Sequence, residues 1–430
     1  MGAIRSVAAD PVTSYCGRTF VAHIAVVGAG ITGITTAYAL IDRGHTVTVF
    51  ERHRYAAMET SFANGGQVSA SNAEVWNHPS TLVKGIKWLF KSDAPLLLNL
   101  KPSWNKYSWL AEFVAQIPHY RENTIATVRL ALEARRALFT LAEREGIAFD
   151  LEKRGILHIY RDKKSFEHAG KVNVLLREGG LERYAVSAAD IKSIEPAIHG
   201  DYYGAFYTPS DATGDIHKFT QGLAAACVRR GARLICDATV RQVTASDAGI
   251  GVAWQSADNG AAAQNSTADA VVICAGVESR NFAAMLGDWV NIYPVKGYSI
   301  TVNLDDLKSQ DAAPWVSLLD DEAKIVTSRL GQGRFRVAGT AELNGINRDI
   351  REDRVRPLVT WTRRLFPCIS TERVVPWAGL RPMLPNMLPR VGAGRRSRVF
   401  YNTGHGHLGW TLSAATAGMV VEAVDLGLGF

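Results

Sequence analysis

The chain has 430 residues, of which 47% are hydrophobic and 21% charged, a composition that excludes intrinsically disordered, collagen-like and small disulfide-stabilised proteins. Its length predicts a globular protein of two interleaved domains. The 48 Lys and Arg residues against 41 Asp and Glu give a net charge of +7, but the basic residues are largely dispersed, which argues against a dedicated nucleic-acid-binding surface.

The cysteines and the apolar stretches indicate where such a protein resides. The five cysteines lie far apart and form neither a C-x-x-C motif nor a Cys/His metal pattern, so we expect no metal site and a reducing, cytoplasmic compartment. Residues 1–20 lack an apolar core of signal-peptide length and are predicted to be a short extension. Residues 24–41 and 399–421 carry no charge, but glycines, threonines and histidines interrupt them, which favours strand–loop–helix segments over membrane spans.

Residues 23–51 have the pattern of a strand, a glycine-rich turn, a helix that ends near Gly44, and a second strand. The turn contains G-x-G-x-x-G, and Glu51 follows about 20 residues later. In such a unit the glycines permit a tight turn, the approach of a pyrophosphate and close packing of the helix, while the acidic residue accepts hydrogen bonds from a ribose. The dinucleotide-binding residues predicted here are Gly28, Gly30, Ile31, Thr32, Gly33, Glu51 and Arg52.

The middle of the chain interrupts this nucleotide-binding pattern. Residues 84–110 mix bulky apolar, aromatic and lysine residues, as in a cap over an active site or a surface segment that touches a bilayer. Residues 121–145 have the spacing of a long amphipathic helix that ends at Gly146. A helix capped by Asp215 is expected to run to Arg230, and the segment 234–240 that follows is expected to be one strand.

The remaining segments predict a second, sheet-rich domain and a return to the first. Residues 292–343 alternate in strand fashion, and a helical segment then stops before Pro367. A buried-type strand ends at Gly276, and a strand at 399–402 leads into a Gly/His loop and a C-terminal helix. The N-terminus of that helix, near Trp410, favours negative charge beside it.

Five motifs occur in a characteristic order: ETSFANGGQVS (59–69), PVKGYS (294–299), DEAKI (321–325), GLRPMLP (379–385) and NTGHGHLGWTLS (402–413). With the glycine fingerprint they resemble the D-amino acid dehydrogenase small subunit family, within the glycine oxidase and sarcosine oxidase superfamily of FAD enzymes, from His23 to the end. The resemblance implies a mixed α/β and α+β fold. A Rossmann-like FAD-binding domain (21–85, 195–285 and 375–430) would be interleaved with a substrate-binding domain (86–194 and 286–374) built on a mainly antiparallel sheet.

The resemblance also implies a non-covalent FAD, because no cysteine stands beside GLRP, where sarcosine oxidases attach their flavin. The C-terminal helix would stabilise a reduced, anionic flavin. The residues that it assigns to FAD, in addition to the fingerprint, are Thr60, Ser61, Asn64, Gly65, Gly66, Gln67, Val240, Ala275, Gly276, Gly404, His405, Gly406, Leu408 and Gly409.

Three residues are assigned to the substrate. Arg381 in GLRP is expected to bind an amino acid carboxylate, since a guanidinium pairs with a carboxylate through two hydrogen bonds. Tyr298 in KGYS is a second candidate for that carboxylate, with half-buried core as its alternative. His407 is expected to face the substrate, while His405 would support the loop.

Two positions depart from the family pattern. Ala323 replaces the usual aromatic residue before the lysine of DEAKI, and Asn386–Met387 replaces the usual Asp-Gly after GLRP. A smaller residue at 323 predicts a wider substrate pocket and leaves the identity of the amino acid open.

The predicted function is oxidative deamination of a D-amino acid, in which a hydride passes from Cα to flavin N5. The resulting imino acid hydrolyses to a 2-oxo acid and ammonia, and the electrons pass to quinone or another non-oxygen carrier. Arg336, near the place where sarcosine oxidases carry a lysine for oxygen reactivity, supports that acceptor. Peripheral contact with the inner face of the cytoplasmic membrane is possible on this reading, and no nucleic-acid partner is expected.

Other functions fit the same sequence. An oxidase of glycine, sarcosine or a cyclic secondary amine such as D-proline or hydroxyproline uses the same chemistry. An RNA-modifying flavoenzyme is supported only by the net charge of +7. A non-catalytic flavin-binding or membrane-docking protein is the remaining alternative. No sequence feature indicates an oligomeric state.

Overall fold

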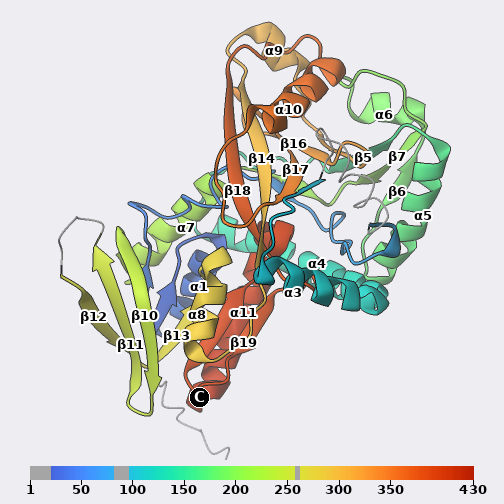
Figure 1. Ribbon diagram of the computed structural model, residues 1–430. Helices are drawn as coiled ribbons and strands as arrows, with labels where there is room; N and C mark the ends of the chain where they lie inside the picture. The colour runs from blue at the N-terminus through green and yellow to red at the C-terminus, as the bar shows by residue number, and fades with distance from the viewer. Residues whose placement is uncertain (1–20, 82–95, 257–261) are drawn as a thin grey trace, which may run out of the picture.

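The predicted strand–helix–strand unit forms the centre of a six-stranded, mainly parallel sheet (Figure 1). The computed structural model describes residues 21–81, 96–256 and 262–430, so the predicted N-terminal extension and much of the lysine-rich segment lie outside the described residues. The strand order is β19-β20-β13-β1-β2-β9, with only β19 antiparallel to its neighbour. The sheet consists of β1 (His23–Val27), β2 (Thr46–Phe50), β9 (Arg233–Ile235), β13 (Ala270–Ile273), β19 (Arg390–Ala393) and β20 (Val399–Thr403).

Both faces of this sheet are buried, which is why its strands are continuous apolar runs. Ile24 and Val26 pack into a cluster with the helices on one face, whereas Ala25 and Val27 pack against the other layer. The helical layer contains α1 (Ile31–Asp42), α4 (Tyr120–Arg144), α7 (Ile216–Arg229) and α11 (Gly409–Leu428). The opposite layer contains α8 (Ser279–Leu286) and the antiparallel strands β10 (Ala238–Ser246), β11 (Gly249–Ser256) and β12 (Gln264–Ala268).

The C-terminal apolar stretch forms a core helix. The helical segment Gly406–Leu428 is long and apolar enough to cross a membrane, but half of an apolar 18-residue stretch within it is buried inside the protein. Val420, Val421 and Val424 of α11 pack into the same cluster as α1, α7 and the sheet. The expected strand, loop and helix are therefore confirmed for residues 399–428.

A second sheet of nine strands lies beside the first and is mainly antiparallel, as predicted (Figure 1). Its order is β18-β14-β17-β16-β15-β5-β7-β6, and β4 pairs in parallel with β17. The helix α10 (Glu352–Leu365) packs on one face through Leu358, Trp361 and Leu365. The strands are β4 (Leu96–Leu98), β5 (Ile156–Tyr160), β6 (Tyr184–Val186), β7 (Gly204–Thr208), β14 (Tyr293–Asn303), β15 (Ser317–Asp320), β16 (Ile325–Arg329), β17 (Arg334–Leu343) and β18 (Val374–Met383).

Two strands of the second sheet come from ranges that the sequence assigns to the nucleotide-binding domain. β7 lies within 195–285 and most of β18 within 375–430, and both pair in the nine-stranded sheet. Residues 374–383 of β18 pair without interruption along β14. The domain boundaries stay a prediction.

One predicted strand is interrupted in the structure. Residues 234–240 do not form one strand, because Asp237 has a positive φ of 52° and separates β9 from β10. Asp215 caps α7 as predicted, accepting hydrogen bonds from the backbone N–H groups of His217 and Lys218.

The other elements are β3 (Gln67–Val68), β8 (Ala212–Thr213), α3 (Trp104–Ala115), α5 (Lys163–Glu178), α6 (Ala188–Ile194), α9 (Leu307–Ala312), η1 (Ile117–His119), η2 (Gly276–Glu278) and η3 (Gly406–Leu408).

Candidate active site

A cavity of about 1410 Å³ runs from the glycine turn after β1 to the face of β14 and β18 that carries Gly297 and Arg381. With one exception, every residue that the sequence assigned to cofactor or substrate lines this cavity. The exception is Gly33, which lies behind the turn: a Cβ atom there would be 1.9 Å from the carbonyl oxygen of Gly28. Gly33 therefore allows close helix packing, the role that the fingerprint gives its third glycine.

The turn after β1 presents backbone rather than side chains to the cavity. Gly28 has a φ of +102°, and a Cβ atom there would lie 2.7 Å from the carbonyl oxygen of Cys274. Gly30 is the N-cap residue of α1 and supplies no side-chain cap, although the Ser61 hydroxyl accepts a hydrogen bond from the Ile31 N–H at 3.0 Å. The other N–H groups of this first turn can bind an anion such as a pyrophosphate.

Glu51 fixes the same turn from the end of β2. Its Oε2 accepts a hydrogen bond from the Ala29 N–H at 2.8 Å, and its Oε1 accepts one from the His53 N–H at 3.0 Å. A carboxylate oxygen has two lone pairs, so each oxygen keeps one for a ribose hydroxyl. Arg52, beside it, forms an ion pair with Glu59.

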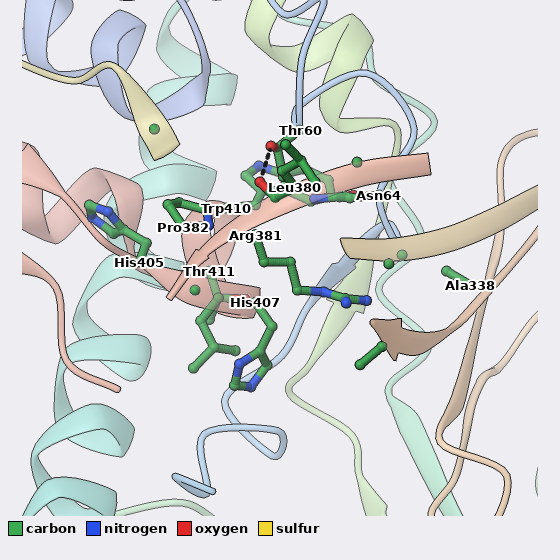
Figure 2. Close-up of a pocket in the computed structure, with 18 of the residues that line it drawn as sticks. Thr60, Asn64, Ala338, Leu380, Arg381, Pro382, His405, His407, Trp410 and Thr411 are labelled. Atoms are coloured by element: carbon green, nitrogen blue, oxygen red, sulfur yellow. Dashed lines mark hydrogen bonds between the residues drawn. The ribbon is translucent and has the colours of Figure 1, made fainter. Parts of the chain in front are cut away.

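The predicted 60–67 loop is held in place by the second sheet. The Thr60 hydroxyl donates to the Leu380 carbonyl at 2.8 Å, as Figure 2 shows, and the Asn64 side chain accepts from the Gly66 N–H at 2.9 Å. The carbonyl of Gly65 accepts a hydrogen bond from the Ser328 hydroxyl at 2.6 Å. These bonds place the loop between the two sheets, where its backbone lines the cavity.

Two further turns complete the cofactor end of the cavity. Val240 lines it beside a bulge in the pairing of β10 with β11, and Gly276, with a φ of +56°, begins the turn after β13. Gly404 and Gly406 also have positive φ, and Cβ atoms there would lie 2.3 Å from Leu384 Cδ1 and 2.7 Å from Met383 Sδ. The N-terminus of α11 follows directly, so its unpaired N–H groups face the same cavity.

Arg381 is half-buried in the cavity wall and has no compensating charge beside it. Its Nη1 donates to the Thr340 carbonyl at 3.3 Å, and no ion pair in the described part of the chain joins it to a carboxylate. Burial lowers the pKa of Arg381 to about 10, so the guanidinium is still charged at neutral pH. A buried unpaired charge is unfavourable, and a bound carboxylate would compensate it.

The Tyr298 side chain packs in the hydrophobic core, which is the alternative that the sequence analysis gives for it. Its hydroxyl donates to Oε2 of Glu342 at 2.7 Å, and its ring belongs to the hydrophobic cluster under α10. Neighbouring residues of a strand point to opposite faces, so the phenol lies on the face opposite Gly297 and Ser299. The phenol is therefore engaged by Glu342, and its contact with the substrate carboxylate stays a prediction.

The two histidines of the Gly/His loop differ in their surroundings. In Figure 2 the side chains of Arg381 and His407 extend to the same side, whereas His405 points away from them. His405 contacts the Thr416 hydroxyl at 3.0 Å, and His407 Nε2 donates to the Asn72 carbonyl at 3.2 Å. Burial lowers the pKa of His405 to about 3 and that of His407 to about 4, so both rings are neutral at pH 7.

The cavity fits FAD by its shape and by its polar atoms. Gly28, Gly66 and Gly404 pack too closely against neighbouring protein atoms to carry a Cβ, so these turns present backbone to the cavity, as an extended dinucleotide requires of its contacts. Thr340 Oγ1, His407 Nδ1 and Trp410 Nε1 are buried without a hydrogen-bond partner among the described residues, and all three residues line the cavity. Buried polar groups are normally paired, so these atoms indicate that a ligand belongs there.

Several lining residues escaped the sequence analysis. Trp76 stacks on His407, and Asn72, Gly297 and Thr340 also line the cavity. Gly297 stands inside the PVKGYS motif, which was the available signal, but which side chain approaches it depends on strand pairing.

Three residues that the sequence analysis singled out lie outside the cavity lining. Ala323 and Met387 are not among the residues that line the cavity and pack into hydrophobic clusters, although Asp321 and Lys324 on either side of Ala323 do line it. The wider pocket expected from Ala323 stays a prediction. Arg336 is also not among the lining residues: its guanidinium donates to the Asn64 carbonyl at 3.0 Å and the Thr301 hydroxyl at 2.8 Å. Arg336 supports the 60–67 loop and does not face the cavity.

The metal and disulfide chemistry of the described residues is simple. No group of three or more His, Cys, Asp or Glu residues within 21–81, 96–256 and 262–430 could hold a metal ion. The four cysteines in these ranges are free thiols. The candidate chemistry therefore rests on the cavity described above.

Comparisons with known proteins agree with this geometry. The chain is 64% identical to "D-amino acid dehydrogenase 3" of Mesorhizobium japonicum over 94% of its length and 97% of that protein, and 41% identical to a D-amino acid dehydrogenase of Paramagnetospirillum magneticum over 94% of both. The fold is similar to glycine oxidase from Geobacillus kaustophilus, with a TM-score of 0.73 and 21% identity over 94% of this chain and 95% of that one. Residues 23–423 match the family model described as DAO, FAD dependent oxidoreductase. The chain therefore belongs to the DAO family of FAD-dependent oxidoreductases.

Proposed function

We propose that this flavoenzyme oxidises a D-amino acid to a 2-oxo acid and ammonia. The observation that carries the proposal is the half-buried Arg381 guanidinium, which has no carboxylate partner among the described residues and lies in the same cavity as the dinucleotide-binding turn. The relatives at 64% and 41% identity, which are named D-amino acid dehydrogenase, support the substrate class.

In this proposal Arg381 holds the α-carboxylate, and His407 holds the amine. The Nε2–H of His407 is donated to Asn72, which leaves Nδ1 as a lone-pair acceptor for an amine N–H. The neutral ring also avoids charge repulsion with Arg381, since burial keeps its pKa near 4. With both ends of the amino acid held, the Cα–H bond has one orientation in the cavity.

The net reaction removes a hydride from Cα and a proton from nitrogen. FAD, when bound, supplies the two-electron acceptor for that hydride. The imino acid that results carries a C=N bond, to which water adds, and the C–N bond then breaks to release ammonia and leave a 2-oxo acid. Hydride transfer from an oriented amine requires neither paired carboxylates nor a Ser/His/Asp arrangement.

We further propose that the cofactor residues divide by position along the cavity. The α1 N-terminus would bind the pyrophosphate and Glu51 the ribose, while the backbone of Val240 and Gly276 would flank the adenosine half. The 60–67 loop and residues 404–409 would enclose the flavin ring, with the α11 N-terminus favouring a reduced, anionic ring. No cysteine adjoins GLRP, which supports non-covalent attachment.

For the electron acceptor we propose quinone or another carrier in place of oxygen. A membrane-bound carrier would suit a cytoplasmic enzyme that touches the inner face of the membrane. Leu100, Trp104 and Tyr107 support such contact, because their side chains are 73%, 76% and 50% exposed near the N-terminus of α3. Stopped-flow mixing of the reduced enzyme with oxygen tests this point: slow reoxidation is expected, and rapid reoxidation would identify an oxidase.

The visible spectrum of the anaerobic holoenzyme tests the reaction itself. Separate additions of D-amino acids, L-amino acids, glycine, sarcosine and D-proline are expected to bleach the oxidised flavin band with D-amino acids only. Bleaching by glycine, sarcosine or D-proline alone would establish the amine oxidation alternative. A spectrum that none of these compounds changes would overturn the proposed function.

A further inference from the structure

Two glycines face each other beneath Arg381 on the cavity side of the second sheet. Gly297 of β14 pairs directly with Gly379 of β18, and Arg381 follows two residues later on the same strand, opposite Val295. Paired residues of antiparallel strands, and alternate residues along each strand, share one face. Gly297, Gly379 and Arg381 therefore lie on the same face, and all three line the cavity.

The Arg381 guanidinium occupies the space that a side chain at residue 297 would fill. A Cβ atom at Gly297 would lie 2.3 Å from both Nη1 and Nη2 of Arg381 and 2.4 Å from its Cζ. Gly297 does not have a positive φ, so its backbone conformation is one that any residue adopts. The nearest atoms to a side chain at residue 297 are thus those of the guanidinium, which would have to move.

A bulge in β17 holds the guanidinium from the side. Tyr298 pairs with Gly339 but Lys296 pairs with Glu342, so β17 contains one extra residue at this point. Thr340 in the bulge has a φ of +58°, which is uncommon for a β-branched residue, and its carbonyl accepts the hydrogen bond from Arg381 Nη1. The bulge turns this carbonyl out of the strand ladder and toward Arg381.

Charged groups on the opposite face fix the bulge. The Glu342 carboxylate, two residues beyond Thr340, accepts a hydrogen bond from Tyr298 at 2.7 Å and lies 3.3 Å from Lys296 Nζ. Lys296 Nζ also donates to the Asn347 side chain at 2.5 Å and is fully buried. This cluster ties β14 to β17 directly behind the guanidinium. The place that holds the guanidinium, formed by Gly297, Gly379 and the Thr340 bulge and called the seat below, therefore has a rigid base.

We propose that Gly297 and the Thr340 bulge are positioning residues that fix the Arg381 guanidinium, and thereby the place where the substrate carboxylate binds. The inference rests on the proposed function, because it assumes that Arg381 binds a carboxylate. It gives the glycine of the PVKGYS motif a definite role: any larger residue at 297 displaces the guanidinium while the strands and the cofactor turns stay as they are.

A double-mutant cycle with Gly297→Ala and Arg381→Ala tests the proposal in the FAD-loaded enzyme. The Kd of pyruvate, a carboxylate without an amine, is measured from the flavin absorbance change, and the KM of D-alanine is measured with a dye as electron acceptor. Gly297→Ala is expected to raise the Kd and the KM at least tenfold, with kcat and FAD content changed less than twofold. In the Arg381→Ala background the same substitution is expected to change the Kd less than twofold.

The outcomes separate the seat from the function. An equal increase in Kd in both backgrounds, or no increase in either, would overturn the role of Gly297. If Gly297→Ala alone does not fold, the double variant is expected to fold because the clashing guanidinium is gone, and a double variant that is also unfolded would contradict the proposal. If D-amino acids leave the wild-type flavin unbleached while pyruvate binding still follows the cycle, the proposed reaction fails and the seat stands.

Discussion

The imidazole of His407 stacks on the indole of Trp76, with ring centroids 5.0 Å apart and ring planes at 23°. Stacked aromatic pairs of this kind contribute about 0.5–1.5 kcal/mol beyond the area that they bury. Trp76→Leu is therefore expected to loosen His407 and raise the KM for the D-amino acid about twofold to tenfold. Trp289→Leu, at an indole that is 63% exposed and outside the cavity lining, serves as the control. Equal KM values for the two variants would show that the stacking has no part in substrate binding.

Arg381→Lys tests whether the fork of the guanidinium matters as well as its charge. A lysine ammonium is a point charge and cannot make two parallel hydrogen bonds to one carboxylate. A charge-assisted contact contributes about 1.5–3 kcal/mol, so the KM is expected to rise about tenfold to a hundredfold. Steady-state kinetics and the flavin absorbance per protein provide the measurement. An unchanged KM would remove Arg381 from the substrate site.

The sequence predicted the nucleotide-binding half of the site better than the substrate half. The glycine turn and Glu51 are read from residue spacing because they lie within a single strand–turn–helix–strand unit. The 404–409 loop was assigned to the flavin by the family resemblance. The face on which the Tyr298 side chain lies could not be read, because it is set by pairing with β18 and β17, more than 35 positions away in the chain. The stacking of Trp76 on His407 joins even more distant segments and leaves no local pattern.

Glu51→Gln is expected to weaken FAD binding without changing the KM of the enzyme that retains FAD. The amide accepts only through its oxygen, so one of the two oxygens proposed to accept from the ribose is lost, together with one of the acceptors for Ala29 and His53. Loss of one charge-assisted bond to the ribose, about 1.5–3 kcal/mol, corresponds to a Kd for FAD raised about tenfold to a hundredfold. Fluorescence of FAD released on dilution measures it. Arg381→Ala, which changes the other end of the cavity, is the matched control, and equal FAD retention in both variants would contradict the role of Glu51.

The buried histidines predict a loss of stability in mild acid. His405 has a pKa lowered by burial to about 3, whereas an unfolded histidine titrates near 6.5. Between these values the unfolded chain binds a proton that the folded protein does not, so stability falls as pH decreases from about 6.5 toward 3. His405→Asn keeps a polar partner for Thr416 and removes the titration. Melting temperatures from pH 7.5 to 4.5 are expected to fall less steeply for this variant, and parallel curves would contradict the assignment.

Asp211 is predicted to be a principal anchor of the segment that carries Asn72. Its side chain is completely buried, forms an ion pair with Arg135, and accepts hydrogen bonds from the Ala70 and Ser71 N–H groups at 2.9 and 3.0 Å. Asp211→Asn leaves the Arg135 charge buried and uncompensated, which costs about 3–5 kcal/mol. The next carbonyl along the chain, that of Asn72, holds His407, so the variant is also expected to raise the KM.

The matched control for this anchor is an exposed ion pair. Asp42 pairs with Arg144 and Arg230, and these three side chains are 36–47% exposed. Asp42→Asn is therefore expected to cost less than about 1 kcal/mol, because solvent screens surface pairs. Thermal unfolding of both variants at saturating FAD should show a large loss of melting temperature for Asp211→Asn and a small one for Asp42→Asn. Similar losses would mean that the backbone hydrogen bonds to residue 211, which asparagine can partly keep, hold the segment without help from the ion pair.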